Sequence, residues 1–191
     1  MTTGDMLKIT VNLTVICVLA GLILSVTWAE TDPVKVREEA HEKEVALKRL
    51  VPAAETILPV KDVVIAGKEN TIYEARAGGD VIGYVVSSSG KGYSSFIKLL
   101  VASDKDYRVT GIDILGHGET PGLGDQIDQA WFKEQFKGKV VDNLVVVKGE
   151  TKTDIQAISG ATISSKGVTR GVKDGLEKLK EETSPPSLER K

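Results

Sequence analysis

The chain has 191 residues, a length that suits one domain with short appendages. Its 25 Lys and Arg residues nearly balance 27 Asp and Glu residues, which argues against a nucleic-acid binder because that class needs a basic face. A single cysteine excludes an internal disulfide and a cysteine-based metal cluster, and two histidines at unrelated positions disfavour a histidine-rich metal site. We therefore expect neither a metal site nor a nucleic-acid partner.

After a short head of residues 1–8, residues 9–28 are apolar and carry no charge. As a helix, about twenty residues cover the roughly 30 Å hydrocarbon core of a bilayer, and Trp28 closes the run at interface depth. The alternative is a signal peptide cleaved after the Thr27-Trp28-Ala29 stretch. Because the run is longer than a usual signal core, the sequence favours a retained single-pass anchor.

Charges near the ends of this span do not fix its orientation, because Lys8 and Asp5 precede it and mixed charges follow it. A short head and a long polar remainder are typical of an anchor whose bulk is translocated. We therefore expect the main domain on the extracytoplasmic side of the cell membrane, an expectation that rests partly on the family resemblance given below. Residues 29–57 read as a helical connector, in which Asp32 caps a helix that runs to Leu50.

Residues 58–182 read as one α+β domain built on an antiparallel meander, and residues 183–191 as a disordered tail. The expected strands are 60–65, 71–75, 81–86, 96–101, 107–115 and 143–147. Short turns at 78–80 and 104–106 and a Ser/Gly loop at 87–92 join the first five. Two helices are expected, a short one over 129–136 and a longer one over 163–180. Glycines 167, 171 and 175 lie on one face of the longer helix, where small size permits close packing.

The stretch Ser159-Gly160-Ala161-Thr162 ends an extended segment and opens the last helix. A helix start offers unpaired N–H groups and the positive end of the helix dipole, so it is suited to bind an anion such as phosphate. Ser164 and Ser165 add hydroxyls to the same turn. The plainer alternative is an ordinary N-cap, because Ser or Thr before a helix is common.

A second informative loop covers residues 116–125, where four glycines and a proline specify a particular backbone path. The loop also carries His117, Glu119 and Thr120, and such loops often line functional sites. A long turn with incidental polar residues is the alternative, and His117 is a further candidate for hydrogen bonding.

Two motifs carry a family resemblance. Ser-Gly-Ala-Thr followed by Ile-Ser-Ser resembles the flavinylation motif of the FMN-binding domain family. Glu-Thr-Pro-Gly-Leu-Gly at 119–124 resembles the equivalent loop of the G subunits of Rnf complexes. The Gly92-Tyr93 loop and the spacing of Trp131 and Phe136 fit the same family. The NqrC subunit of sodium-pumping quinone reductases shares the first motif, so the resemblance implies a transmembrane helix followed by a globular FMN-binding domain.

The resemblance implies that a separate flavin transferase esterifies the phosphate of FMN to the hydroxyl of Thr162. Around it, Ser159, Gly160 and Ala161 form the turn, while Ser164, Ser165 and Lys166 hold the phosphate. We expect Glu119, Thr120, Leu123 and Gly124 to form the pocket of the flavin ring. The sequence departs from the family at Gln156, where an Asp is usual, and Asp154 lies two residues further back.

The function implied is that of an electron-carrying subunit of a membrane-bound ferredoxin:NAD oxidoreductase complex coupled to Na⁺ or H⁺ movement. Such a subunit relays electrons through covalent FMN to neighbouring membrane and peripheral subunits, with no catalytic residue of its own. Three alternatives remain open: a stand-alone membrane-anchored flavoprotein reductase, a non-redox anchored adaptor, and a sensor domain.

Overall fold

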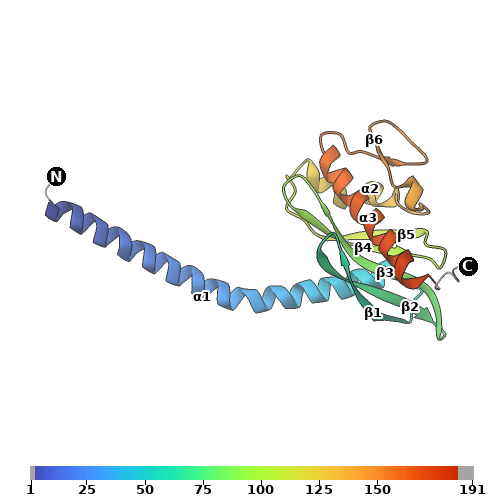
Figure 1. Ribbon diagram of the computed structural model, residues 1–191, viewed down its shortest axis with the longest axis horizontal. Coiled ribbons are helices and arrows are strands. Elements are labelled where there is room, and N and C mark those ends of the chain that lie inside the picture. The colour runs from blue at the N-terminus through green and yellow to red at the C-terminus, as the bar shows by residue number, and fades with distance from the viewer. Residues whose placement is uncertain (1–2, 185–191) are drawn as a thin grey trace, which may run out of the picture. The chain divides into compact units, whose positions relative to one another are not determined.

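The computed structural model describes residues 3–184, and of residues 29–36 it describes the backbone alone. Helix α1 covers Thr3–Leu50 without interruption (Figure 1). Its first part, Thr3–Trp28, has a mean hydropathy of 2.4 and is apolar and long enough to cross a membrane. The chain divides into two compact units between Glu42 and Lys43.

The expectation that a separate helix begins at Asp32 is wrong, because the backbone is already helical on both sides of this residue. A single proline disfavours a helix interior by about 3 kcal/mol, whereas long runs of helix-forming residues on either side favour propagation through it. Of the tail expected over 183–191, Thr183 ends the last helix, and the segment from residue 185 lies outside the described residues.

Five antiparallel strands follow one another in chain order and form the central sheet, which confirms the expected α+β class (Figure 1). They are β1 (Thr56–Ile65), β2 (Lys68–Ala77), β3 (Asp80–Lys91), β4 (Phe96–Ser103) and β5 (Val109–Gly116). Gly78 and Gly79 have positive φ in the turn between β2 and β3, as the expected hairpin requires. The last of the five begins two residues later than expected because Tyr107 has a φ of +58° and ends the preceding turn.

The Ser/Gly run at 87–92 does not form the expected loop, because β3 continues through it to Lys91. Its small residues lie directly beneath helix α3 (Thr162–Thr183). A Cβ atom added at Gly90 would lie 1.8 Å from the carbonyl oxygen of Gly167, and the Ser88 hydroxyl donates to the Gly171 carbonyl at 2.7 Å. The small residues that suggest a loop therefore form a contact surface, which lets the helix approach the strand closely.

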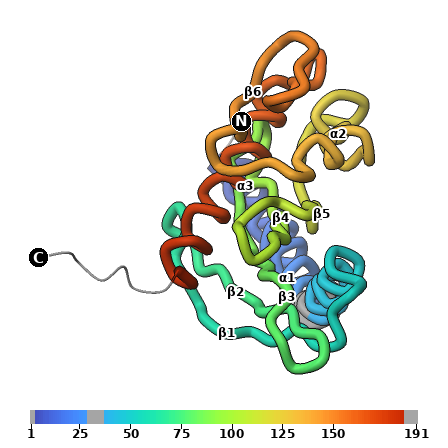
Figure 2. Tube along the Cα trace, turned by 90° about the vertical axis from the view of Figure 1, so that its right-hand side faces the viewer, coloured from blue at the N-terminus to red at the C-terminus, as the bar shows by residue number. Residues whose placement is uncertain are grey.

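Helix α3 covers one face of the sheet, and its side chains Val168, Val172, Leu176 and Leu179 are buried in the main core. On β3, Val86 joins that core, whereas Val85 points to a second cluster that includes Ala46 and Leu47 from the end of α1. The middle of the sheet is thus covered on both faces, with α3 on one side of β3 and residues 43–50 of α1 on the other (Figure 2).

The segment between β5 and α3 is built from short elements. These are η1 (Gly124–Asp128), α2 (Ala130–Glu134), η2 (Val141–Asn143), β6 (Val146–Val147) and β7 (Ile155–Gln156). The strand expected over 143–147 is only two residues long, because residue 143 still belongs to the 3₁₀ turn η2. It pairs in parallel with β7, which the sequence did not predict.

A buried carboxylate ties this segment to the rest of the domain. Asp113 on β5 accepts a hydrogen bond from Lys133 of α2 at 2.9 Å and from Arg49 at the end of α1 at 3.2 Å. Removing one partner of such a buried group leaves an uncompensated charge, so this pair of contacts fixes α2 against the sheet edge.

Candidate functional site

Helix α3 begins with a turn whose hydroxyl-bearing residues face two clefts. Gly160 has a φ of +78°, which turns the chain into the helix without strain. The N-cap is Ala161, and no side chain caps the helix. The Thr162 hydroxyl makes no hydrogen bond with any group that the structure describes between residues 3 and 184. The plain N-cap alternative for Thr162 is therefore wrong, and this hydroxyl remains available for chemistry.

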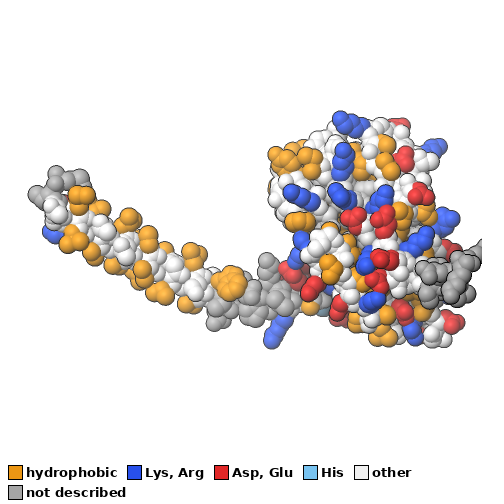
Figure 3. Space-filling model, viewed as in Figure 1, with side chains coloured by type: hydrophobic (Ala, Val, Ile, Leu, Met, Phe, Trp, Pro, Cys, Tyr) orange, Lys and Arg blue, Asp and Glu red, His pale blue; other side chains and the backbone are white. Residues whose placement is uncertain are grey.

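On one side of this turn lies the Leu123 cleft, with a volume of about 550 Å³. It is lined by the 119–124 loop and by the first residues of α3, namely Glu119, Thr120, Leu123, Gly124, Gly160, Ala161, Thr162, Ile163 and Ser164, together with Tyr93. Leu123, Ile163 and Tyr93 are 46%, 52% and 71% exposed, so large apolar surfaces stand free at the cleft. Hydrophobic side chains gather at the end of the domain where α3 begins (Figure 3). Such a cleft is suited to a planar apolar ligand.

Glu119 is buried at the base of the Leu123 cleft, and its carboxylate accepts four hydrogen bonds. The backbone N–H groups of Tyr93, Ser94 and Ser95 donate at 3.0, 3.0 and 3.2 Å, and the hydroxyl of Ser164 is the fourth donor. Burial alone raises the pKa of Glu119, but these hydrogen bonds outweigh burial and lower the pKa below its ordinary value. Glu119 is therefore an ionised clamp that joins the 92–95 loop to α3.

His117 lies behind this clamp and lines neither cleft. Its Nδ1 accepts a hydrogen bond from the backbone N–H of Glu119 at 3.1 Å, and its Nε2 lies 2.9 Å from a carboxylate oxygen of Asp128. Since Nδ1 is the acceptor, Nε2 carries the proton and donates it to Asp128. Both ring nitrogens are thus occupied in holding the loop.

On the other side of the turn lies the Trp131 cleft, with a volume of about 510 Å³. It is more polar than the Leu123 cleft, and it is lined by Gln126, Trp131, Lys148, Gln156, Ala157, Ile158, Ser159, Gly160 and Thr162. Thr162 and Gly160 border both clefts. Gln156 thus lies in the same cleft as Thr162, whereas the carboxylate of Asp154 accepts hydrogen bonds from Thr151 and Thr153 in its own loop.

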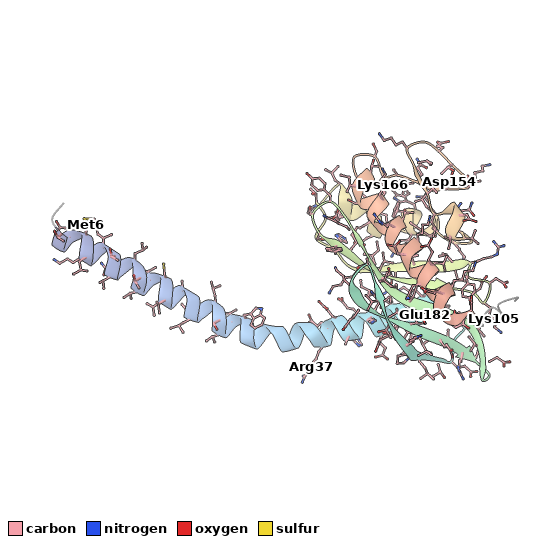
Figure 4. The ribbon with its side chains drawn as sticks, in the orientation of Figure 1. Met6, Arg37, Lys105, Asp154, Lys166 and Glu182 are labelled. Atoms are coloured by element: carbon pink, nitrogen blue, oxygen red, sulfur yellow. The ribbon has the colours of Figure 1, made fainter. Side chains whose placement is uncertain are left out.

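The fold places most of the residues suggested by sequence around these two clefts. Ser165 is the exception among the hydroxyls: it is fully buried, accepts from the Ile158 N–H and donates to the Ala161 carbonyl, both at 3.0 Å. Lys166 is exposed on the first turn of α3 and lines neither cleft (Figure 4). Sequence reasoning missed Lys148 and Ile163 as lining residues, and it used Trp131 only as a spacing signal.

Comparison with known proteins defines the class to which this fold and site belong. Residues 92–177, which contain both the 119–124 loop and the Thr162 turn, match the FMN-binding domain family. Two solved structures share the fold. One is NqrC of Shewanella oneidensis, 27% identical over 69% of this chain and 71% of that one. The other is the corresponding protein of the Na⁺-translocating NADH-quinone reductase of Parabacteroides distasonis, 29% identical over 61% and 64%. Both have a TM-score of 0.51.

Curated relatives narrow the class further. The chain is 40% identical to the G protein of the proton-translocating ferredoxin:NAD⁺ oxidoreductase complex of Clostridium ljungdahlii, over 92% of both chains. It is 34% identical to the G protein of the Na⁺-translocating ferredoxin:NAD⁺ oxidoreductase complex of Acetobacterium woodii, over 89% of both chains. The chain therefore belongs to the family of G subunits of Rnf-type ion-translocating oxidoreductase complexes.

Proposed function

We propose that this chain carries electrons within a membrane-bound ferredoxin:NAD oxidoreductase complex coupled to ion translocation, through FMN bound as a phosphoester to Thr162. The observation that carries the proposal is the Thr162 hydroxyl, which has no hydrogen-bond partner among the described groups and lies at a helix start bordering two clefts. The names of the relatives, which are matched over about nine tenths of their length, supply the setting.

The residues present fit FMN. The apolar Leu123 cleft has room for a flavin ring beside Leu123 and Ile163. A Cβ atom at Gly124 would lie 2.8 Å from the Cβ atom of Glu119, so only glycine lets this part of the loop pack against Glu119. The first N–H groups of α3 and the positive end of its dipole favour an anion on the Thr162 side chain. The bound flavin would accept and return electrons.

Each protein group around Thr162 then has a positioning role. Glu119 and Ser164 hold the 92–95 loop against the first turn of α3, which keeps the walls of the Leu123 cleft together. Ser165 fastens the segment before the turn, since it bonds both Ile158 and Ala161. Thr120 accepts backbone hydrogen bonds from Leu123 and Gly124 through its carbonyl oxygen, which shapes the loop that bears Leu123. Ser159 and Gly160 form the wall of the Trp131 cleft.

The rest of the proposal concerns the surroundings of the chain. The Thr3–Trp28 segment anchors it in the cell membrane as a single span, with the FMN-binding domain on the extracytoplasmic side. A separate flavin transferase attaches the cofactor, as the resemblance to the FMN-binding domain family implies. Other subunits of the complex deliver and remove the electrons.

The test is in-gel fluorescence of the full chain, co-expressed with a flavin transferase and run under denaturing conditions beside Thr162→Val. Valine keeps the shape of threonine and removes the hydroxyl. We expect a fluorescent band and an intact mass gain equal to FMN less one water for the wild type, and neither for the variant.

Thr120→Val is the matched control, because Thr120 is the other threonine lining the Leu123 cleft. It should keep the mass gain. An unmodified wild type in the presence of a transferase that modifies a second substrate would contradict the covalent proposal and favour an anchored adaptor. Flavin that is released on denaturation would instead favour a stand-alone reductase with dissociable FMN.

A further inference from the structure

The Trp131 cleft has a single formal charge among its lining side chains, and this charge is the ammonium group of Lys148. Lys148 is exposed at the rim of this cleft, and within the described part of the chain its ammonium makes no ion pair or hydrogen bond. A cation without a partner, in a cleft that has no carboxylate in its lining and begins at a helix N-terminus, favours an anion in that cleft.

The backbone around Lys148 is held in place by strand pairing. Val147 pairs with Gln156 in the parallel ladder of β6 and β7, and the Ala157 N–H donates to the Val147 carbonyl at 2.8 Å. Lys148 is the next residue after this pair, and Gln156 and Ala157 line the same cleft. The pairing therefore brings Lys148 beside the segment that leads into the Thr162 turn.

Thr162 borders both clefts, so a phosphate on its hydroxyl lies where the two clefts meet. A phosphodiester keeps one negative charge, which needs a donor or cation on at least one side. Among the side chains that line the Leu123 cleft, Glu119 carries the one formal charge; it is held in its ionised form and already has four donors. A cation that contacts this phosphate therefore comes from the Trp131 cleft or from α3 itself, because the lining of the Leu123 cleft contains none.

We propose that Lys148 binds the phosphate of the Thr162-linked flavin from the Trp131 cleft, while the ring occupies the Leu123 cleft. The inference rests on the proposed function, because it needs FMN on Thr162. Lys148 then has the phosphate-binding role that the sequence suggests for Lys166, because Lys166 lines neither cleft. The Trp131 cleft thus acts as the phosphate side of the site.

The experiment compares Lys148→Gln with Lys152→Gln and Lys166→Gln in the full chain, each prepared with and without a co-expressed flavin transferase. Lys152→Gln removes a charge from the same loop while keeping the backbone carbonyl to which Lys139 donates. For each variant, we measure the shift in Tm that FMN attachment causes, at about 10 mM and about 1 M salt, between which the Debye length falls from about 30 to about 3 Å.

For the wild type and the two control variants, we expect attachment to raise Tm more at low salt than at high salt, because salt screens the contact between lysine and phosphate. Lys148→Gln should lose this salt dependence and have the smallest shift. A salt-dependent Tm shift in Lys148→Gln equal to that of Lys152→Gln would overturn the inference. Loss of the salt dependence in Lys166→Gln alone would overturn it too, and would assign the phosphate contact to Lys166. A wild type without a mass gain would instead contradict the proposed function, so the two failures are distinguishable.

Discussion

Glu119 connects two segments that are distant in sequence, because the backbone donors at Tyr93, Ser94 and Ser95 precede it by 24 to 26 residues. Glu119→Gln would place an amide group opposite some of these donors and leave buried N–H groups unsatisfied. We expect a loss of about 1–3 kcal/mol in the free energy of unfolding, measured by urea denaturation. Glu134→Gln on the exposed surface of α2 is the control and should change little; an equal loss in both variants would contradict the clamp.

The same residue predicts a pH dependence with a definite sign. The pKa of Glu119 is lowered in the folded protein, so its contribution to stability is complete above the ordinary carboxyl pKa of about 4.3. That contribution is lost as the pH falls through the lowered folded value. The difference in Tm between the wild type and Glu119→Gln should therefore shrink from about pH 6 to about pH 3. A constant difference over this range would mean that the carboxylate charge is not involved.

At the scale of single residues, the sequence motifs predicted roles for Thr162 and Glu119 at an FMN site, but not the role of Glu119 as an acceptor that joins the 92–95 loop to α3. Each lies in a short motif that is recognisable locally, and the fold brings both motifs to the lining of the Leu123 cleft. The role of Glu119 as an acceptor depends on the path of the 92–95 loop. The position of Lys148 beside the Thr162 turn depends on a two-residue parallel strand pair. Such non-local contacts leave no periodic signal in the sequence.

At the scale of elements, the contact between β3 and α3 requires glycine on both sides. Gly90→Ala would place a methyl group 1.8 Å from the Gly167 carbonyl oxygen, so the helix must shift away from the strand. We expect the free energy of unfolding to fall by about 1–3 kcal/mol or more, as measured by thermal unfolding. Gly116→Ala is the matched control, because a Cβ atom there meets nothing within 4 Å. A stable Gly90→Ala variant would show that the two elements are not in close contact.

The two clefts give a second prediction at this scale, about the position of the flavin ring. Phenol and indole side chains in contact with an excited flavin quench its fluorescence by electron transfer. If the ring lies in the Leu123 cleft, Tyr93→Leu should raise the quantum yield of the attached flavin. Trp131→Leu, in the other cleft, should leave it nearly unchanged. The opposite pattern would place the ring beside Trp131.

The elements themselves were largely predictable, since strand alternation, glycine turns and the apolar stripe of α3 are local patterns. The Ser/Gly run of β3 was mistaken for a loop because small residues serve both purposes. Only the glycines of α3 opposite it distinguish a contact surface from a turn, and that pairing depends on the tertiary fold.

At the scale of the whole molecule, the proposed orientation in the membrane can be tested with a single cysteine. Cys17 lies within the apolar span, so Cys17→Ser gives a cysteine-free background. Lys105→Cys then adds a thiol in the exposed turn between β4 and β5 (Figure 4). We expect a membrane-impermeant maleimide to label this thiol in intact cells. Labelling only after cell lysis would place the domain on the cytoplasmic side.

The order of the elements along the chain also bears on when the protein becomes complete. The five strands come first, but one face of the sheet stays uncovered until α3, the last helix, has been synthesised. The Ser88–Gly171 hydrogen bond, for example, joins residues 83 positions apart. At ~5–20 residues per second, the ribosome needs several seconds to pass from β5 to the end of α3.

During that interval the apolar face of the sheet is exposed, and Thr162 has no cleft on either side. If FMN is attached at Thr162 as proposed, a fluorescent band on a gel comes only from chains that have been synthesised into the C-terminal helix.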